Sequence, residues 1–416
     1  MASDYGDWCR SIGVAASESL TLTEFDGERG VAAATAIEAG ELLVSVPFET
    51  MLTTASLVGT PLEPLLSDAE LNVCEDDLLA ILLLEERAKG AASRWAPHIA
   101  ALPPRYDNVL YFSDADVERL HGSNLHVTAR QLREQVATDH VKLFPKLLRK
   151  YGKVLTLVSK DCSRDAYQWA LSSVYSRCCS VTRKGKLHKA MCCFFDMFNH
   201  DPYSTSQHSF VDAADALELR VGVACPSGEQ VMINYGPVGN SKFLTFYGFA
   251  LADNPYDSVD VWATMSPQAP DYAIKRQVLK QAKCDDSKPF LLTAQREEDG
   301  LVSSWADGRP IERGVPSALI GCLRVQRMTD AEMSVAPLAF DEQLSESNEN
   351  GVKGALASAF SDMLAAYGDS TKADLEAAAT GTGRAQTIAH LRVSEKEILG
   401  ACLAELTGEE PLGKID

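Results

Sequence analysis

The sequence has 416 residues, of which 46% are hydrophobic and 23% charged, a composition typical of a folded protein rather than a disordered chain. Its 39 lysines and arginines stand against 58 aspartates and glutamates, which gives a formal charge of −19. So acidic a surface repels phosphate backbones, and no apolar run reaches about 18 residues, the length that predicts a membrane span. We therefore expect neither a nucleic-acid nor a membrane partner.

The cysteines and the first residues indicate a reduced chain. Eleven cysteines is an odd number for a fully disulfide-bonded protein, and the first eight residues carry two acids and no apolar core. We predict no signal or transit peptide, and a location in the cytoplasm with the nucleus as the alternative. Cys178-Cys179 and Cys192-Cys193 are adjacent pairs, which chelate one ion poorly, so we predict no metal site.

Two segments have the form strand, Gly-Glu turn, strand. The first spans residues 30–47 with its turn at 38–41, and the second spans 217–235 with its turn at 226–229. Apolar runs on both sides of a glycine-containing turn predict a hairpin or a corner in each segment.

Helices are predicted between and after these strands. The leucine-rich run 78–87 predicts a helix with a broad buried face, and two more are expected at 128–150 and 164–178. From about residue 268 the pattern predicts helices only, at 270–284, 316–328, 350–367, 370–380 and 384–406. The chain is therefore expected to be a β-rich part with a helical insert, followed by an all-helical part.

Polar residues interrupt an apolar run at 192–202. Asp196, Asn199 and His200 need hydrogen-bond partners if this run is buried, so the pattern leaves both a turn cap and a ligand site open. The familiar alternatives are missing, because the sequence has no P-loop, Rossmann fingerprint, nucleophile elbow or His-Glu-x-x-His motif.

A second unusual segment covers residues 234–257. It contains two Tyr-Gly steps, at Tyr235 and Tyr247, and a helix is expected to begin near Asn240. In this order and about 35 residues apart, the two segments resemble the SET domain, in the branch that includes the Rubisco large-subunit lysine methyltransferase and the actin histidine methyltransferase.

Four further segments resemble the same family, so that nearly the whole chain is covered. They are the first cofactor loop at 28–31, the insert signature at 95–103 with 120–125, the strand-entry motif at 172–177, and a C-terminal tail that ends at 392–399. The resemblance implies an α+β fold in which small β-sheets surround a pseudoknot, with a helical insert at about 62–165 and an all-α C-terminal domain. The SET domain would span residues 1–267, and the helical substrate-binding domain 268–416.

The resemblance also implies S-adenosylmethionine as the cofactor. The residues implied to bind it are Glu28, Arg29, Gly30, Arg177, Asn199, His200, Tyr235 and Phe249. Arg177 suits the cofactor carboxylate through charge-assisted hydrogen bonds. Tyr235 would also be the catalytic residue, because its hydroxyl can orient the attacking nitrogen, and Asp196 and Tyr247 would line the substrate channel.

The leading functional prediction is a protein-lysine N-methyltransferase. The alternatives are a protein-histidine N-methyltransferase on the same scaffold and a catalytically silent protein-binding module. In the histidine branch an asparagine that orients imidazole stands two residues after the motif arginine, and Cys179 at that position favours lysine. Retention of the implied catalytic and cofactor residues argues against the silent module. We expect a monomer that acts on a protein with a basic surface, which the acidic chain would attract.

Overall fold

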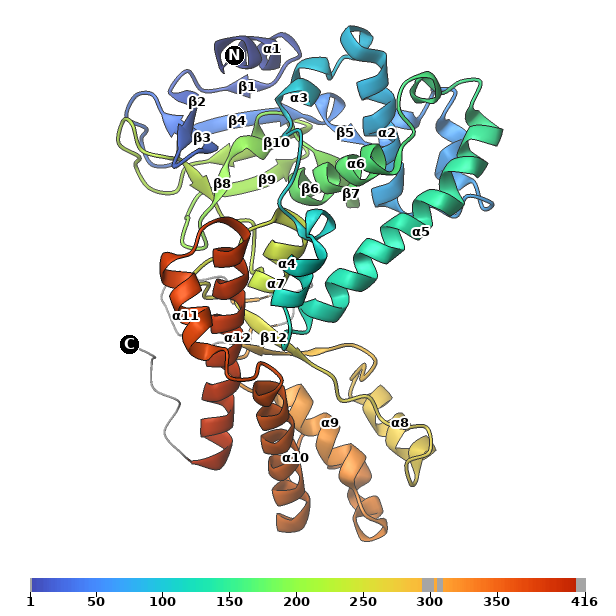
Figure 1. The fold of residues 1–416 in the computed structure, drawn as a ribbon, viewed down its shortest axis with the longest axis vertical. Coiled ribbons are helices and arrows are strands. Elements are labelled where there is room, and N and C mark those ends of the chain that lie inside the picture. Colours follow the sequence, from blue (N-terminus) through green and yellow to red (C-terminus); the bar gives the residue numbers. More distant parts are fainter. Residues whose placement is uncertain (1, 294–302, 305–309, 409–416) are drawn as a thin grey trace. The chain divides into compact units, whose positions relative to one another are not determined.

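The structure is a computed structural model that describes residues 2–293, 303–304 and 310–408 (Figure 1). The chain divides into two compact units. The first unit comprises Met1–Tyr111, Gln131–Tyr235 and Phe246–Gly248, and the second comprises Phe112–Arg130, Gly236–Thr245 and Phe249–Asp416. Each unit therefore draws on segments that are far apart in the sequence.

Small β-sheets form the centre of the first unit. Its strands are β1 Ala15–Ala16, β2 Leu20–Phe25, β3 Glu28–Ala33, β4 Leu42–Pro47, β5 Leu52–Thr53, β6 Cys178–Arg183, β7 Lys186–Met191, β8 Asn199–His200, β9 Gln207–Val211, β10 Ala216–Arg220 and β11 Met232–Ile233. They form a four-stranded sheet in the order β1-β4-β10-β9, a three-stranded sheet β5-β7-β6, and the pairs β2-β3 and β8-β11. These sheets confirm the predicted α+β class.

The two strand–turn–strand segments pair with each other rather than with themselves. β4 lies antiparallel to β10, with Val46 opposite Leu217, and isolated bridges join Ala32 to Gln230 and Ile37 to Cys225. Each segment is therefore a corner, not a hairpin. Every strand has two hydrogen-bonding edges, so a short glycine-containing turn does not determine whether the strands on its two sides pair with each other or with other strands.

Helices cover these sheets. They are α1 Ala2–Ser11, α2 Glu75–Lys89, α3 Ala96–Ala101, α5 Leu125–Tyr151, whose first turn belongs to the second unit, and α6 Arg164–Arg177. Short 3-10 turns connect them at Phe48–Thr50, Thr54–Leu57, Glu63–Ser67, Gly90–Ala92, Val109–Tyr111, Thr156–Ser159 and Phe195–Met197. α2 packs along α6 and buries the continuous run 78–86, as its leucine-rich sequence predicts.

A parallel pair of two-residue strands lies closest to the predicted site. Asn199 of β8 stands opposite Met232 of β11, His200 stands opposite Ile233, and the Asp201 backbone N–H donates to the Ile233 carbonyl over 3.0 Å. This pairing places the Asn-His segment beside the strand that leads directly into Tyr235.

The second unit is mainly helical. Its elements are α4 Asp114–Arg119, α7 Asn240–Lys242, β12 Ser258–Val261, α8 Tyr272–Gln281, β13 Phe290–Thr293, α9 Ser317–Arg327, a 3-10 segment Asp330–Leu338, α10 Glu346–Ala365, α11 Thr371–Thr380 and α12 Gly383–Thr407. α7 continues as the π-helical turn Phe243–Tyr247, where a helix was expected. None of the helices described is long and apolar enough to cross a bilayer.

The expectation of helices only after residue 268 is wrong at one place. β13 pairs antiparallel with β12, with Val259 opposite Leu292. The four-residue apolar run of β13 is too short for its periodicity to separate a strand from a buried helical turn. The domain boundary at residue 267 stays a prediction.

Candidate active site

Tyr235 is held in one orientation by contacts at both ends. Its backbone N–H donates to Nδ1 of His200 over 3.0 Å, and its hydroxyl donates to the Phe198 carbonyl over 2.7 Å. Its ring centroid lies 4.9 Å from that of His200 and 5.4 Å from that of Tyr247. Burial raises the pKa of Tyr235 well above its ordinary value, with Arg177 opposing the rise, so the phenol is a hydrogen-bond donor and not a base at neutral pH.

Asn199 joins the predicted cofactor loop to the turn before β11. Its Nδ2 donates to the Arg29 carbonyl over 3.1 Å and to Oε1 of Gln230 over 2.8 Å. A Cβ atom at Gly30 would lie 2.4 Å from that same Oε1 and 3.0 Å from Nδ2 of Asn199, so no larger residue fits without a shift of these groups. Gln230 was not among the predicted site residues, although it stands two residues before β11.

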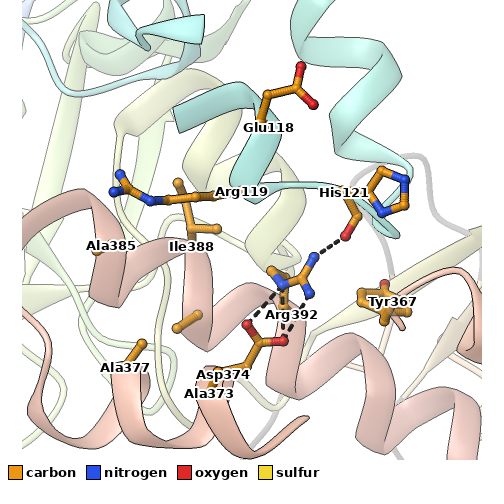
Figure 2. Close-up of a pocket in the computed structure, with 11 residues that line it drawn as sticks. Glu118, Arg119, His121, Tyr367, Ala373, Asp374, Ala377, Ala385, Ile388 and Arg392 are labelled. Carbon is orange, nitrogen blue, oxygen red and sulfur yellow. Dashed lines mark hydrogen bonds and ion pairs between the residues drawn. The ribbon is translucent and has the colours of Figure 1, made fainter. Parts of the chain in front are cut away.

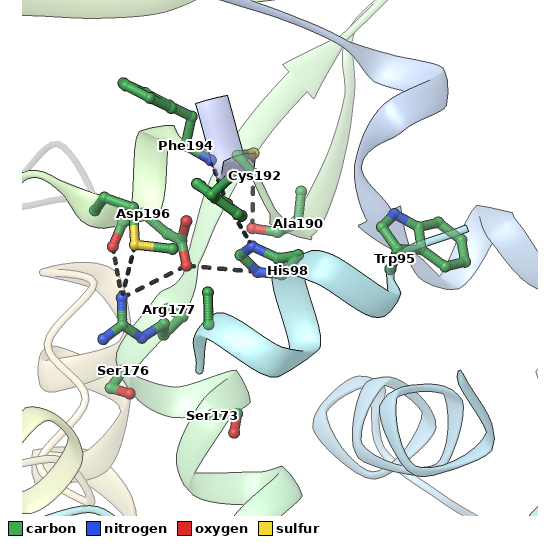
Figure 3. A network of polar contacts seen from close by, with 12 residues as sticks. Trp95, His98, Ser173, Ser176, Arg177, Ala190, Cys192, Phe194 and Asp196 are labelled. Atoms are coloured by element: carbon green, nitrogen blue, oxygen red, sulfur yellow. Dashed lines mark hydrogen bonds and ion pairs between the residues drawn. The ribbon is translucent and has the colours of Figure 1, made fainter. Parts of the chain in front are cut away.

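Arg177, Asp196 and His98 form a buried polar group in the first unit (Figure 3). Nη1 of Arg177 donates to the Asp196 carbonyl over 2.8 Å and lies 3.6 Å from Oδ2 of the same residue. Nε2 of His98 also lies 3.6 Å from this Oδ2, and the Asp196 and His98 side chains are both 1% exposed. His98 lies in the insert signature but was not predicted as a site residue.

Several atoms of this group have no hydrogen bond within the described part of the chain. They are Nε of Arg177, Nε2 of His98 and both carboxylate oxygens of Asp196. Burial lowers the pKa of the nearby Arg29, and the positive charge of Arg177 lowers it further. Two guanidinium groups against one carboxylate leave a net positive charge, and buried polar atoms without partners are rare unless they bind something. The group can therefore accept an anion.

The remaining predicted residues differ in their surroundings. Tyr247 closes the π-helical turn, and burial raises its pKa to about 12, with a further contribution from Cys179. Glu28 is exposed at the start of β3. Phe249 belongs to the second unit, where its ring stacks on Phe243 with centroids 4.7 Å apart. Its role at the cofactor stays a prediction, as do the roles of the other site residues.

A second polar cluster lies in the second unit, beside a cavity of about 370 Å³ between α4, α11 and α12 (Figure 2). Nε of Arg392 donates to both carboxylate oxygens of Asp374, over 3.1 and 3.0 Å, and Nζ of Lys396 donates to Oδ2 over 2.6 Å. Glu395 accepts from Oγ of Ser123 over 2.9 Å and from the Tyr367 hydroxyl over 2.7 Å. Across the residues described, no three His, Cys, Asp or Glu side chains gather as a metal-binding group.

Comparisons with known proteins place the chain. Residues 266–399 match the family described as "Rubisco LSMT substrate-binding". The actin-histidine N-methyltransferase of Xenopus tropicalis is 32% identical over 292 residues, which cover 69% of this chain and 49% of that protein. The Gallus gallus protein of the same name is 29% identical over 413 residues, 94% of this chain and 66% of its own length. A solved structure, the SET domain of LSMT bound to lysine and AdoHcy, superposes with a TM-score of 0.80 at 18% identity, over 98% of this chain and 91% of that one.

Residues 266–399 carry the Rubisco LSMT substrate-binding domain, and the whole chain has the fold of the LSMT SET domain, which supports the SET-domain, Rubisco LSMT-like branch. This confirms the resemblance drawn from the sequence. The chain spans about half the length of the first curated relatives it matches. Within the SET-domain part, the first unit brings Arg29, Gly30, Arg177, Asn199 and His200 together with Tyr235.

Proposed function

We propose that this chain is an S-adenosylmethionine-dependent protein N-methyltransferase whose target is a histidine side chain. The observation that carries the proposal is the β8–β11 pairing, which holds Asn199 and His200 against Tyr235 in a chain related to the actin-histidine N-methyltransferases. The names of these relatives favour histidine over the lysine target that was our leading prediction.

The residues present fit the cofactor. S-adenosylmethionine supplies a methyl group on a sulfonium and carries an amino-acid carboxylate. Arg177, with an Nε that lacks a partner in the described chain, is suited to bind that carboxylate, and the net positive charge of the Arg29–Arg177–Asp196 group favours it. Gly30 allows the loop to lie close to Asn199, which fits a loop that binds a ligand through its backbone.

The protonation states of the site favour a target nitrogen that is already neutral. Burial lowers the pKa of His200 to about 4, and Tyr235 keeps its proton. A histidine side chain is largely neutral above its ordinary pKa of about 6.5, so it offers a lone pair without a strong base. The site then needs to orient the imidazole, and good alignment lowers such barriers by up to ~7–11 kcal/mol.

A lysine target is the second candidate, and Cys179 is the observation that favours it. The resemblance implies an asparagine amide at this position in the histidine branch, whereas this chain has a thiol, whose Sγ lies 3.7 Å from Sγ of Cys192. A thiol is a weak hydrogen-bond donor and a poor partner for imidazole. A lysine would need its pKa lowered by desolvation in the channel before it could attack.

The test is to incubate the purified chain with labelled S-adenosylmethionine and, separately, with actin and with a cell lysate. Mass spectrometry then identifies the modified residue. Label on a histidine supports the proposal, and label on lysine alone establishes the second candidate. A folded chain that neither binds the cofactor by calorimetry nor transfers label contradicts both and leaves the silent binding module.

A further inference from the structure

We propose that Tyr5 and His98 are positioning residues that hold Asp196 and Arg177 in the geometry that binds the cofactor carboxylate. The inference rests on the proposed function. It concerns side chains that lie far apart in the sequence: Tyr5 comes from α1, His98 from α3, and Asp196 from the 3-10 turn Phe195–Met197.

Tyr5 secures a strained backbone position. Phe194 has φ +70° and ψ −43°, a left-handed conformation that side chains other than glycine rarely adopt. The Phe194 N–H donates to the Tyr5 hydroxyl over 3.1 Å, and the two rings stack with centroids 6.5 Å apart and an interplanar angle of 10°. Strained residues persist where their surroundings hold them, and the turn that carries Asp196 begins at the next residue.

The Tyr5 hydroxyl also sets the proton position on His98. It lies 2.8 Å from Nδ1 of His98, and burial raises the pKa of Tyr5 far above its usual range, so the phenol keeps a proton to donate to Nδ1. Burial lowers the pKa of His98, with Asp196 opposing and the charges of Arg177 and Arg29 assisting. A neutral imidazole that accepts at Nδ1 carries its proton on Nε2, which faces Oδ2 of Asp196.

Asp196 in turn fixes Arg177. The arginine contacts the Asp196 backbone carbonyl and faces its carboxylate through the same Nη1, which leaves Nε for a ligand. If the His98 donor is lost, the buried carboxylate has one fewer positive dipole beside it and attracts the guanidinium more strongly. If the Tyr5 hydroxyl is lost, the Phe194 turn is released as well. Both changes move Arg177 away from the position that suits an external carboxylate.

The test compares two ligands by calorimetry on the full chain. S-adenosylhomocysteine carries the amino-acid carboxylate, and 5′-methylthioadenosine lacks it. We expect Tyr5→Phe and His98→Asn to raise the dissociation constant for S-adenosylhomocysteine about tenfold, because either change shifts the carboxylate that positions Arg177, and to leave that for methylthioadenosine within about twofold. His98→Gln, whose amide nitrogen reaches the place of Nε2, should keep the affinity within about threefold.

Tyr167→Phe is the matched control. Tyr167 is also a fully buried tyrosine of the first unit, but its hydroxyl donates to Asp77, outside the Arg177 group. Its replacement should change neither dissociation constant, and melting midpoints identify any variant that fails to fold. Equal losses for both ligands would show a general structural role and overturn the proposal, as would unchanged binding of S-adenosylhomocysteine. If the unmodified chain binds neither ligand, the proposed function itself fails, and the inference with it.

Discussion

The two buried polar clusters differ in how completely their atoms are paired. In the second unit, Asp374 accepts hydrogen bonds from Arg392 (Figure 2) and from Lys396. Glu395 accepts hydrogen bonds from two hydroxyl groups. In the first unit, the Asp196 carboxylate makes no hydrogen bond to the described residues, although its side chain is 1% exposed (Figure 3). Both clusters contain buried arginine and carboxylate groups, so composition does not distinguish them.

The difference separates a structural cluster from a ligand-binding one. When one partner is removed from a fully bonded cluster, the remaining buried groups lose their hydrogen bonds or ion pairs, and the fold is destabilised. In a cluster with unpaired polar atoms, the free protein is already destabilised by burying them, and a ligand that supplies the missing hydrogen-bond partners removes this destabilisation. Substitutions in the second unit should therefore change stability, and substitutions near Tyr235 should change catalysis.

The largest expected effect follows from Asp374→Ala. The change leaves Arg392 and Lys396, whose side chains are 6% and 9% exposed, without their carboxylate, so unfolding should become easier by ~3–5 kcal/mol. Urea denaturation measures this. The exposed Asp369→Ala is the control and should stay within about 0.5 kcal/mol of the unmodified chain. An unchanged midpoint for Asp374→Ala would contradict the structural assignment of this cluster.

Tyr235→Phe tests the other side of the comparison. It removes one hydrogen bond, to the Phe198 carbonyl, so stability should fall by only about 1 kcal/mol. Turnover should fall about 100-fold, or ~2.7 kcal/mol of transition-state stabilisation, because the hydroxyl no longer orients the nucleophile. Cofactor affinity should stay within a few-fold. Steady-state kinetics together with calorimetry measure both quantities, and unchanged turnover would remove Tyr235 from the mechanism.

A pH series sharpens the comparison within the second cluster. Burial raises the pKa of Glu395 to about 8, against about 4.5 in an unfolded chain. Between these values the folded chain holds a proton that the unfolded chain releases, so stability should fall as pH rises from 5 to 8, by on the order of 3 kcal/mol. Glu395→Gln does not titrate and should lose this slope. Parallel pH profiles of urea midpoints for the two proteins would contradict the buried neutral carboxyl.

The smallest expected effect concerns the choice of target. Cys179 influences the pKa of Tyr247, and an amide at this position could hold an imidazole. We expect Cys179→Asn to raise the histidine-to-lysine ratio of kcat/KM about tenfold, the value of one neutral hydrogen bond. Cys225→Asn, at the isolated bridge to Ile37, is the control and should leave the ratio unchanged. Competition between matched histidine and lysine peptides measures the ratio of kcat/KM. An unchanged ratio would show that Cys179 does not determine the choice of target.

Local patterns predicted long elements and motif residues well. The leucine run of α2 and the helices α9 to α12 are long enough to be recognised from local sequence, and the Asn-His and Tyr-Gly motifs identified the neighbours that β8 and β11 bring together. Two-residue strands such as β5 have no pattern of their own, because tertiary pairing alone defines them.

Long-range partners were not predictable from the sequence. The Tyr5–His98 bond spans 93 positions, and the contact between His98 and Asp196 spans a similar distance, so neither residue shows its role locally. The role of Gln230 could not be predicted locally either, because its hydrogen-bond partner Asn199 is 31 positions away in the sequence. A single sequence shows the spacing of residues within a helix or strand, but it does not show which helices and strands contact each other.

The parallel pair β8–β11 also sets the order in which the chain can mature during synthesis. Its second strand must be made before Asn199 and His200 can be fixed, and a pairing so remote in sequence closes a long loop, which slows folding compared with helix formation. While Tyr235 is still inside the ribosome, the emerged chain holds α2 and α6 but lacks the strand on which the binding site depends. A newly made chain should therefore gain cofactor affinity late and in one step, rather than gradually as its helices form.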